Sequence, residues 1–312
     1  MTVKQESVND YLSVLILLNM QSTDSYKTVF LAKKLSRMKI IFNLLFFLCI
    51  NYCLYGQNSR MIDQIRNQAG GTAVWWAGQD SWVIKSGGLV IATDLFLEDK
   101  GRIAPSPVTP AELAGVLDIS FITHSHGDHF EEYTSKILLE KSSCIFVMPE
   151  SCLEEAHRMK IPDSRIVIAK PRVPFEIKGI KVQPIRAIHG NANFAIYYDA
   201  NLQDCGYLLT INGKTFLQPG DTYLLEDHLF IKKVNVLFVS PTEHNMYIDP
   251  SVILINALNP DYIFPQHHST VAVSEENRFW AKGYPEEVKL RLSQPLKERY
   301  HILSPGDMME IK

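Results

Sequence analysis

Three histidines and an aspartate lie within six residues, in Thr123-His124-Ser125-His126-Gly127-Asp128-His129. They directly follow residues 118–123, a short apolar run that is typical of a buried strand. Imidazole nitrogens and carboxylate oxygens are ligands for zinc and its neighbours, and a loop held by a rigid strand fixes several ligands with little ordering cost. An exposed polar loop does not need this composition. The segment therefore predicts a metal site and leaves the number of metals open.

Further candidate ligands occur much later in the chain. Each one comes after a predicted strand: His189 after residues 181–188, Asp221 after 214–218, and His267 and His268 after 261–264. A single histidine or aspartate at such a place is more often structural. Because strand ends along one sheet edge converge in space, their shared placement favours a common site with residues 124–129.

Two predicted hairpins organise the strands around these residues. In the first, strands 81–85 and 89–93 flank Gly87-Gly88 and lead to Asp94, which is expected to orient a ligand histidine. In the second, strands 206–211 and 214–218 flank Asn212-Gly213, a strong hairpin turn, and lead to Asp221. This weak internal repeat indicates a fold with two related halves.

Strand-like and helix-like segments alternate through the rest of residues 57–312. Strands are predicted at 72–77, 118–123, 144–148, 165–169, 181–188, 235–239 and 261–264, and helices at 131–140, 150–159, 251–258 and 286–292. No linker or charge run divides this stretch, so it is interpreted as one domain. The pattern predicts an α/β protein in which sheets are covered by helices.

Residues 1–56 differ chemically from the remainder. They hold six Lys/Arg and three Asp/Glu, a charge of +3, which leaves −6 on the other 256 residues because the whole chain carries −3. Residues 40–50 form an apolar run behind several lysines, as in a secretory signal peptide. The expected location is secreted or periplasmic, with Met38 as a possible true start. An uncleaved segment would instead anchor the protein to a membrane.

Composition argues against several other classes of function. The net charge of −3 argues against a protein that coats nucleic acid or anionic membrane. Cys144, Cys152 and Cys205 are widely spaced and have no C-x-x-C pattern, so they are expected to be buried apolar side chains rather than disulfides or metal ligands.

Taken together, these residues resemble the metallo-β-lactamase superfamily of metal-dependent hydrolases. The resemblance rests on His124-x-His126-x-Asp128-His129, on His189, on Pro219-Gly220-Asp221-Thr222 and on a late Pro-x-His motif at His267. It implies an αββα sandwich of two mixed β-sheets flanked by helices, with the metal site at one edge of the sheets. Residues 74–84 resemble the branch that contains ascorbate-phosphate lactonase-like and N-acyl-phosphatidylethanolamine phospholipase-like members.

The resemblance also implies a ligand set for two divalent ions. His124, His126 and His189 would bind the first ion, Asp128, His129 and His267 the second, and Asp221 would bridge both. Zinc is the expected metal, and the carboxylates also suit manganese or iron. The branch usually has Gly-His where this chain has Gly78-Gln79, and His268 is an alternative to His267 as the last ligand.

A bridged metal pair would hold a hydroxide that attacks a substrate carbonyl or phosphoryl centre. Asp128 and Asp221 are the expected catalytic carboxylates, and Asp128 would orient the nucleophile or pass a proton. The predicted function is hydrolysis of an ester, lactone or amide bond in a small molecule. The alternatives are a phosphodiesterase with the same centre and a metal-stabilised binding module without turnover. Substrate and oligomeric state are left open.

Overall fold

The computed structural model describes residues 59–188 and 202–312. The chain divides after Gln57, and the described residues all belong to the unit Asn58–Lys312. The predictions for residues 1–56 and for His189 fall outside the described residues. None of the described helices has the length and apolar character needed to cross a membrane.

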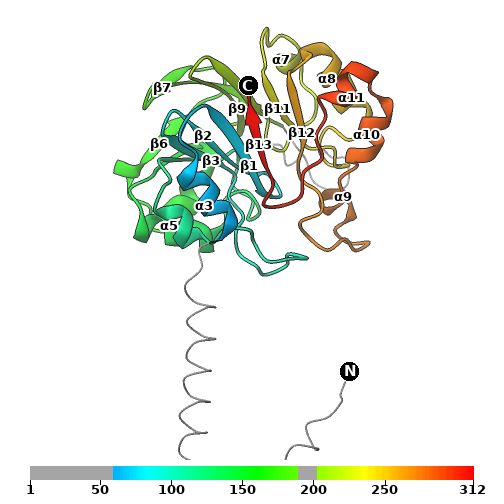
Figure 1. Ribbon diagram of the computed structural model, residues 1–312. Coiled ribbons are helices and arrows are strands. Elements are labelled where there is room, and N and C mark those ends of the chain that lie inside the picture. Colours follow the sequence, from blue (N-terminus) through cyan, green and yellow to red (C-terminus); the bar gives the residue numbers. More distant parts are fainter. Residues whose placement is uncertain (1–58, 189–201) are drawn as a thin grey trace, which may run out of the picture. The chain divides into compact units, whose positions relative to one another are not determined.

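Two mixed β-sheets form the centre of this unit (Figure 1). The first sheet has the order β13 (Met308–Ile311), β1 (Thr72–Gly78), β2 (Ser81–Ser86), β3 (Leu89–Thr93), β4 (Ile119–Phe121), β5 (Ile145–Pro149) and β6 (Ile166–Ala169). The second has the order β12 (Tyr262–Pro265), β11 (Val236–Val239), β10 (Lys214–Gln218), β9 (Cys205–Ile211), β8 (Ile180–Arg186) and β7 (Phe175–Ile177). Both are mixed, because β3 to β6 and β10 to β12 pair in parallel while the other neighbours are antiparallel.

Helices lie on the outer face of each sheet (Figure 1). The helices that cover the first sheet are α3 (Arg60–Asn67), α4 (Pro110–Ala114), α5 (Glu132–Lys141) and α6 (Leu153–Arg158). Those that cover the second are α8 (Asp249–Leu258), α10 (Pro285–Arg291) and α11 (Gln294–Glu298). The shorter elements are the α-helices α7 (Glu226–Leu229) and α9 (Arg278–Ala281) and the 3₁₀ turns η1 (Glu150–Cys152) and η2 (Asp163–Arg165).

Three apolar layers hold these elements together. The middle layer lies between the sheets and contains the aromatic side chains of Trp76, Trp82, Phe121, Phe238 and Phe264, all fully buried. The outer layers join each sheet to its helices. Burial of apolar surface is the main stabilising contribution in such a core. The predicted αββα sandwich is thus confirmed, and so is the burial of the three cysteines that lie in the described residues.

The structure corrects one predicted element and adds several short ones. Residues 150–159, predicted as one helix, form η1 followed by α6, which ends at Arg158. Neither β7, with three residues, nor β13 and α9, with four, is long enough to show a periodic pattern. β13 nevertheless completes the first sheet, because it pairs antiparallel with β1 from Thr72 to Trp75.

Candidate metal centre

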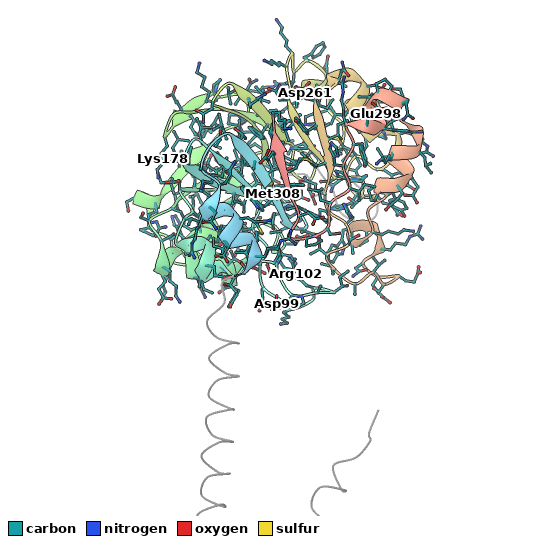
Figure 2. The ribbon with its side chains drawn as sticks, in the orientation of Figure 1. Asp99, Arg102, Lys178, Asp261, Glu298 and Met308 are labelled. Carbon is teal, nitrogen blue, oxygen red and sulfur yellow. The ribbon has the colours of Figure 1, made fainter. Side chains whose placement is uncertain are left out.

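The predicted ligands gather where strands of both sheets end. Residues 124–129 follow β4, Asp221 follows β10, and His267 follows β12. Figure 2 shows Asp261, which precedes β12, at one end of the body, and Asp99 and Arg102 at the opposite end. The loop that carries Arg102 reaches the segment after His267, since Ile103 N donates to Thr270 O over 2.9 Å. The site therefore lies at the end of the sandwich where β12 terminates.

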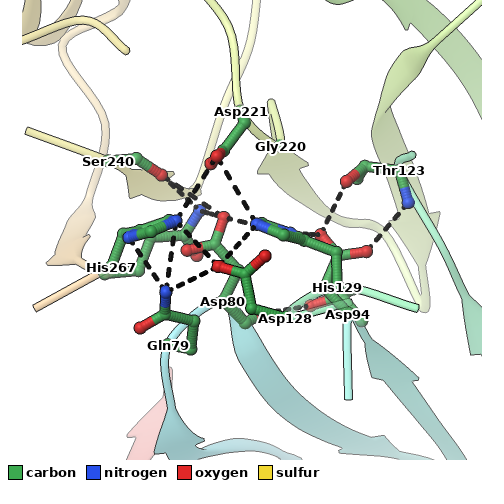
Figure 3. A network of polar contacts seen from close by, with 12 residues as sticks. Gln79, Asp80, Asp94, Thr123, Asp128, His129, Gly220, Asp221, Ser240 and His267 are labelled. Atoms are coloured by element: carbon green, nitrogen blue, oxygen red, sulfur yellow. Dashed lines mark hydrogen bonds and ion pairs between the residues drawn. The ribbon is translucent and has the colours of Figure 1, made fainter. Parts of the chain in front are cut away.

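The imidazole of His129 lies among the carboxylates of Asp94, Asp128 and Asp221 (Figure 3). Its Nε2 is buried, has no hydrogen-bond partner among the described residues, and lies 3.5 Å from Asp221 Oδ2 and 3.8 Å from Asp128 Oδ2. Burial alone would lower the pKa of His129, but the carboxylates of Asp221 and Asp128 outweigh it and hold that pKa well above its usual value. The surroundings of this ring thus favour a positive charge next to its Nε2.

Three imidazoles of the described residues contact the same oxygen of Asp221. Its Oδ1 accepts a hydrogen bond from Asn245 Nδ2 over 2.8 Å. Its Oδ2 is the common neighbour of three Nε2 atoms, those of His244 at 2.8 Å, His267 at 3.3 Å and His129 at 3.5 Å. Burial would raise the pKa of Asp221, but His267, His129 and His244 hold it well below the usual range. The carboxylate is therefore ionised at neutral pH.

Asp128 and His267 are joined through Gln79. The Gln79 side-chain amide donates to Asp128 Oδ2 over 2.9 Å and lies 3.1 Å from His267 Nδ1. His267 Nε2 is 3.5 Å from the same Asp128 oxygen. Gln79 occupies the position where the resembling branch has histidine, and in this chain it fixes the orientation of a predicted ligand pair.

His124 and His126 lie beside this group, with ring centroids 4.6 Å apart. One ligand atom each from His124, His129 and Asp221 can be chosen within 4.8 Å of one another, and the same holds for Asp128, His129 and His267. Burial lowers the pKa of His126, which keeps its ring in the neutral form that binds metals. The structure thus brings together all the predicted ligands that lie in its described part.

Asp94 orients His129 from the side away from Asp221. Its Oδ2 lies 3.2 Å from His129 Nδ1 and accepts from Thr123 Oγ1 over 2.8 Å, while its Oδ1 accepts from Thr123 N over 2.8 Å. A carboxylate on the far nitrogen of a ligand histidine fixes the ring and its tautomer. The predicted contact between Asp94 and a histidine of the cluster is confirmed.

The two late histidines differ in their surroundings. The side chain of His267 reaches Asp128 and Asp221, whereas that of His268 packs on Trp76 at a ring-centroid distance of 4.7 Å, and its Nε2 lies 3.3 Å from Pro265 O. Burial lowers the pKa of His268 to about 4. The structure therefore places His267 in the cluster and His268 outside it.

The predicted ligand set omits His244 and Asn245. Because residues 243–247 follow a predicted strand, they could place His244 near a substrate, but an ordinary surface loop accounts for their sequence at least as well. The surface-loop interpretation is wrong for these two side chains, which are buried against Asp221. One signal for them was available. They follow the strand β11, just as the predicted ligands follow β4, β10 and β12.

A cavity of about 610 Å³ opens beside the cluster. Its walls carry four site residues, namely His126, Asp128, Asp221 and His244, and otherwise consist of Phe96, Lys100, Gly101, Val271, Phe279 and Trp280. This volume suits a small organic molecule. The apolar side chains are suited to the carbon skeleton of a substrate, and Lys100 is the lysine among the described residues of the wall.

The donor atoms suit divalent metal ions. Several imidazole nitrogens and the carboxylates of Asp128 and Asp221 converge in a buried place, and the orphaned Nε2 of His129 faces both carboxylates. Mixed nitrogen and oxygen donors of this kind are typical for zinc and also suit manganese and iron. His124, His126, Asp128, His129, Asp221 and His267 remain the predicted holders of the metal.

Solved structures with a similar fold support the topology. The metallo hydrolase from Ignicoccus hospitalis aligns with a TM-score of 0.60 at 19% identity, over 77% of this chain and 99% of that one. An isothiocyanate hydrolase from Delia radicum gut bacteria aligns with a TM-score of 0.60 at 16% identity, over 76% and 98%. At these identities, the likeness concerns the fold.

Sequence relatives and a family model identify the domain. A metal-dependent hydrolase from Pelotomaculum thermopropionicum is 27% identical over 210 residues, which are 62% of this chain and 82% of the relative. A second, from Carboxydothermus hydrogenoformans, is 26% identical over 247 residues, or 76% and 98%. The model of the β-lactamase superfamily domain matches residues 73–267. The chain therefore belongs to the β-lactamase superfamily and has its metallo-β-lactamase fold.

Proposed function

We propose that this chain is a metal-dependent hydrolase that cleaves an ester, lactone or amide bond of a small molecule. The observation that carries the proposal is the convergence of His124, Asp128, His129, Asp221 and His267 beside a cavity of about 610 Å³. When bound, divalent ions supply Lewis acidity, which acidifies water and stabilises developing negative charge.

The residues around the ions divide the remaining work. Asp94 and Gln79 hold His129 and the pair Asp128–His267 in place through the contacts described above. Asp128, whose side chain is 23% exposed while that of Asp221 is 1% exposed, is the carboxylate that can reach a substrate proton. Burial raises the pKa of Asp128, but His129 and His267 outweigh it and lower that pKa, so the carboxylate is ionised at neutral pH.

The cavity wall favours a carbonyl substrate over a phosphodiester. Phe96, Val271, Phe279 and Trp280 offer apolar contact, and among the described residues of the wall Lys100 is the lysine available to a negative group. A phosphodiesterase site usually carries several positive groups around the phosphate. We therefore expect substrates with an apolar acyl or aryl group next to the scissile bond.

The test combines metal analysis with a substrate panel. Purified full-length protein is assayed for bound metals and for hydrolysis of aryl esters, lactones, β-lactams, thioesters, amides and bis-aryl phosphates. We expect bound divalent metal, turnover of at least one carbonyl substrate, and loss of that turnover in His126→Ala and after chelation. The variant His157→Ala, which changes an exposed histidine paired with Asp163, serves as the control. A folded protein that binds no metal would refute the proposal.

A further inference from the structure

We infer that His244 is a ligand of the metal centre, on the same side as Asp221 and His267. The resemblance that supplied the other ligands gives this position no role. The inference rests on the proposed function, because it concerns the metal that the proposed chemistry uses. Three features of the described structure support it: a fixed ring orientation, the tautomer that this orientation suits, and the number of imidazoles around one carboxylate oxygen.

The ring of His244 is held in place by Phe279, which belongs to α9, and by Thr242. Its backbone N donates to Phe279 O over 3.2 Å, and its Nδ1 lies 3.2 Å from the same carbonyl oxygen and 3.1 Å from Thr242 Oγ1. The ring also makes an edge contact with the Phe279 ring at a centroid distance of 5.9 Å. The side chain is buried, so its Nε2 can point in one direction only, towards Asp221.

This arrangement suits a ring whose proton is on Nδ1. A carbonyl oxygen only accepts hydrogen bonds, so a proton on Nδ1 of His244 would be donated to Phe279 O, beside Thr242 Oγ1. A neutral ring of this tautomer presents a lone pair at Nε2, which lies 2.8 Å from Asp221 Oδ2. Two acceptors at this distance are held together by a cation that both contact, either a shared proton or a metal ion. The same tautomer, with Nδ1 bonded to a backbone carbonyl and Nε2 free to coordinate, is common in metal-binding histidines.

The surroundings of Asp221 Oδ2 indicate that the cation is a divalent metal. His267 and His129 also direct Nε2 at this oxygen, from 3.3 and 3.5 Å. One ligand atom each from Asp221, His244 and His267 can be chosen within 4.8 Å of one another. Asn245, the next residue, donates to the other carboxylate oxygen and turns Oδ2 towards the imidazoles. The segment 244–245 thus both supplies a donor and orients the carboxylate.

The test replaces the imidazole with a donor that reports its own coordination. Full-length His244→Cys protein is loaded with Co²⁺, and its near-ultraviolet spectrum is compared with that of wild type, in which the described cysteines are buried. We expect a new sulfur-to-cobalt charge-transfer band in His244→Cys. The control His157→Cys, at an exposed position of α6, should show no such band. If His244→Cys folds and binds Co²⁺ without the band, the inference is wrong.

A second variant keeps the inference testable if the cysteine protein does not fold. His244→Gln retains a side-chain amide that can donate to Asp221 but that is a poor zinc ligand. In competition with a chelator, we expect His244→Gln to hold Zn²⁺ at least about tenfold more weakly than wild type. Retention equal to that of wild type would show that His244 only hydrogen-bonds to Asp221. A wild-type protein that binds neither ion would refute the proposed function itself, so the two failures are distinguishable.

Discussion

Each of the two central hairpins leads to a buried aspartate, yet the two carboxylates have different partners. The hairpin β2–β3 leads to Asp94, which receives two hydrogen bonds from Thr123 and faces His129 Nδ1. The hairpin β9–β10 leads to Asp221, which faces three imidazole Nε2 atoms. The hairpin in one half thus leads to Asp94, which positions a ligand, and the hairpin in the other leads to Asp221, which is a predicted ligand.

Electrostatics separates the two carboxylates in the same way. Burial raises the pKa of Asp94, and its hydrogen bonds from His129 and Thr123 offset this only in part. Burial acts equally on Asp221, but three histidines outweigh it and hold the pKa well below the usual range. The pKa values of the two aspartates therefore differ because of the charge of their neighbours, rather than the depth of their burial. Substitutions in the two halves should therefore have different consequences.

The largest effect is expected from Asp221→Asn. The amide oxygen would keep the bond from Asn245, so the NH₂ group would face the imidazoles and repel a cation. We expect metal binding to weaken about 100-fold or more, because changing a residue that only orients a ligand costs about 10–100-fold and this change removes a ligand itself. Hydrolysis should fall with it, because a bound metal ion contributes several kcal/mol to transition-state stabilisation. Chelator competition and the hydrolysis assay measure the loss, and circular dichroism verifies folding. If this variant retains metal as wild type does, Asp221 is not a ligand, and the proposed difference in role between the two aspartates is wrong.

Gly220→Ala tests how tightly the two halves are joined. Gly220 has a φ of +66°, and a Cβ there would lie 2.7 Å from the Cβ of Thr123, which belongs to the first half. Backbone strain and overpacking together should lower the free energy of unfolding by about 2–4 kcal/mol. Urea denaturation measures this loss. Gly127→Ala is the control, because no atom lies within 4 Å of a Cβ at that position, and an unchanged stability in Gly220→Ala would contradict the close approach.

Asp94→Asn should have a smaller effect on the metal than Asp221→Asn. Asp94 has a φ of 43°, a conformation that asparagine tolerates, so the backbone is expected to remain in place. The carboxylate accepts from three groups with two oxygens: Thr123 N on Oδ1, and Thr123 Oγ1 and His129 Nδ1 on Oδ2. The amide of asparagine has one acceptor oxygen, so it cannot accept from all three. We expect metal affinity to fall about 10–100-fold, as measured by chelator competition. A loss equal to that of Asp221→Asn would show that Asp94 does more than orient His129.

The sequence predicts the strands that lead to these two aspartates very well. Leu89–Thr93 and Lys214–Gln218 have the predicted bounds, because glycine-containing turns mark their starts and a polar change marks their ends. The ligand positions after β4, β10 and β12 could be predicted for a related reason. Metal chemistry allows few residue types, and these residues all stand at strand ends.

The residues that hold the ligands were harder to predict. His244 is buried because Phe279, 35 residues later, closes over it, and no local pattern indicates that contact. Gln79 could be seen only as a departure from a family motif, since its bond to Asp128 spans 49 residues. Local patterns specify strands and donor types, whereas orientation depends on contacts between distant segments.

The smallest effect, and the sharpest comparison, is expected from Thr123→Val. Valine keeps the shape and the backbone N–H that donates to Asp94 Oδ1, but it removes the hydroxyl that donates to Oδ2 and lies 3.1 Å from His124 Nδ1. Asp94 retains His129 on that oxygen. Loss of these buried contacts should cost about 1–2 kcal/mol of stability, and metal affinity should fall less than in Asp94→Asn because His129 keeps its carboxylate partner.

The matched change in the second half is Thr215→Val, which removes a hydroxyl that donates to Asn235 Oδ1 on the β10 side. Thermal unfolding and chelator competition are measured for both variants. Thr215→Val should lower the melting temperature and leave metal affinity unchanged, since neither Thr215 nor Asn235 contacts the cluster. If Thr123→Val also leaves metal affinity unchanged, the hydroxyl contributes only stability, and the orientation of His129 depends on Asp94 and its backbone contact alone.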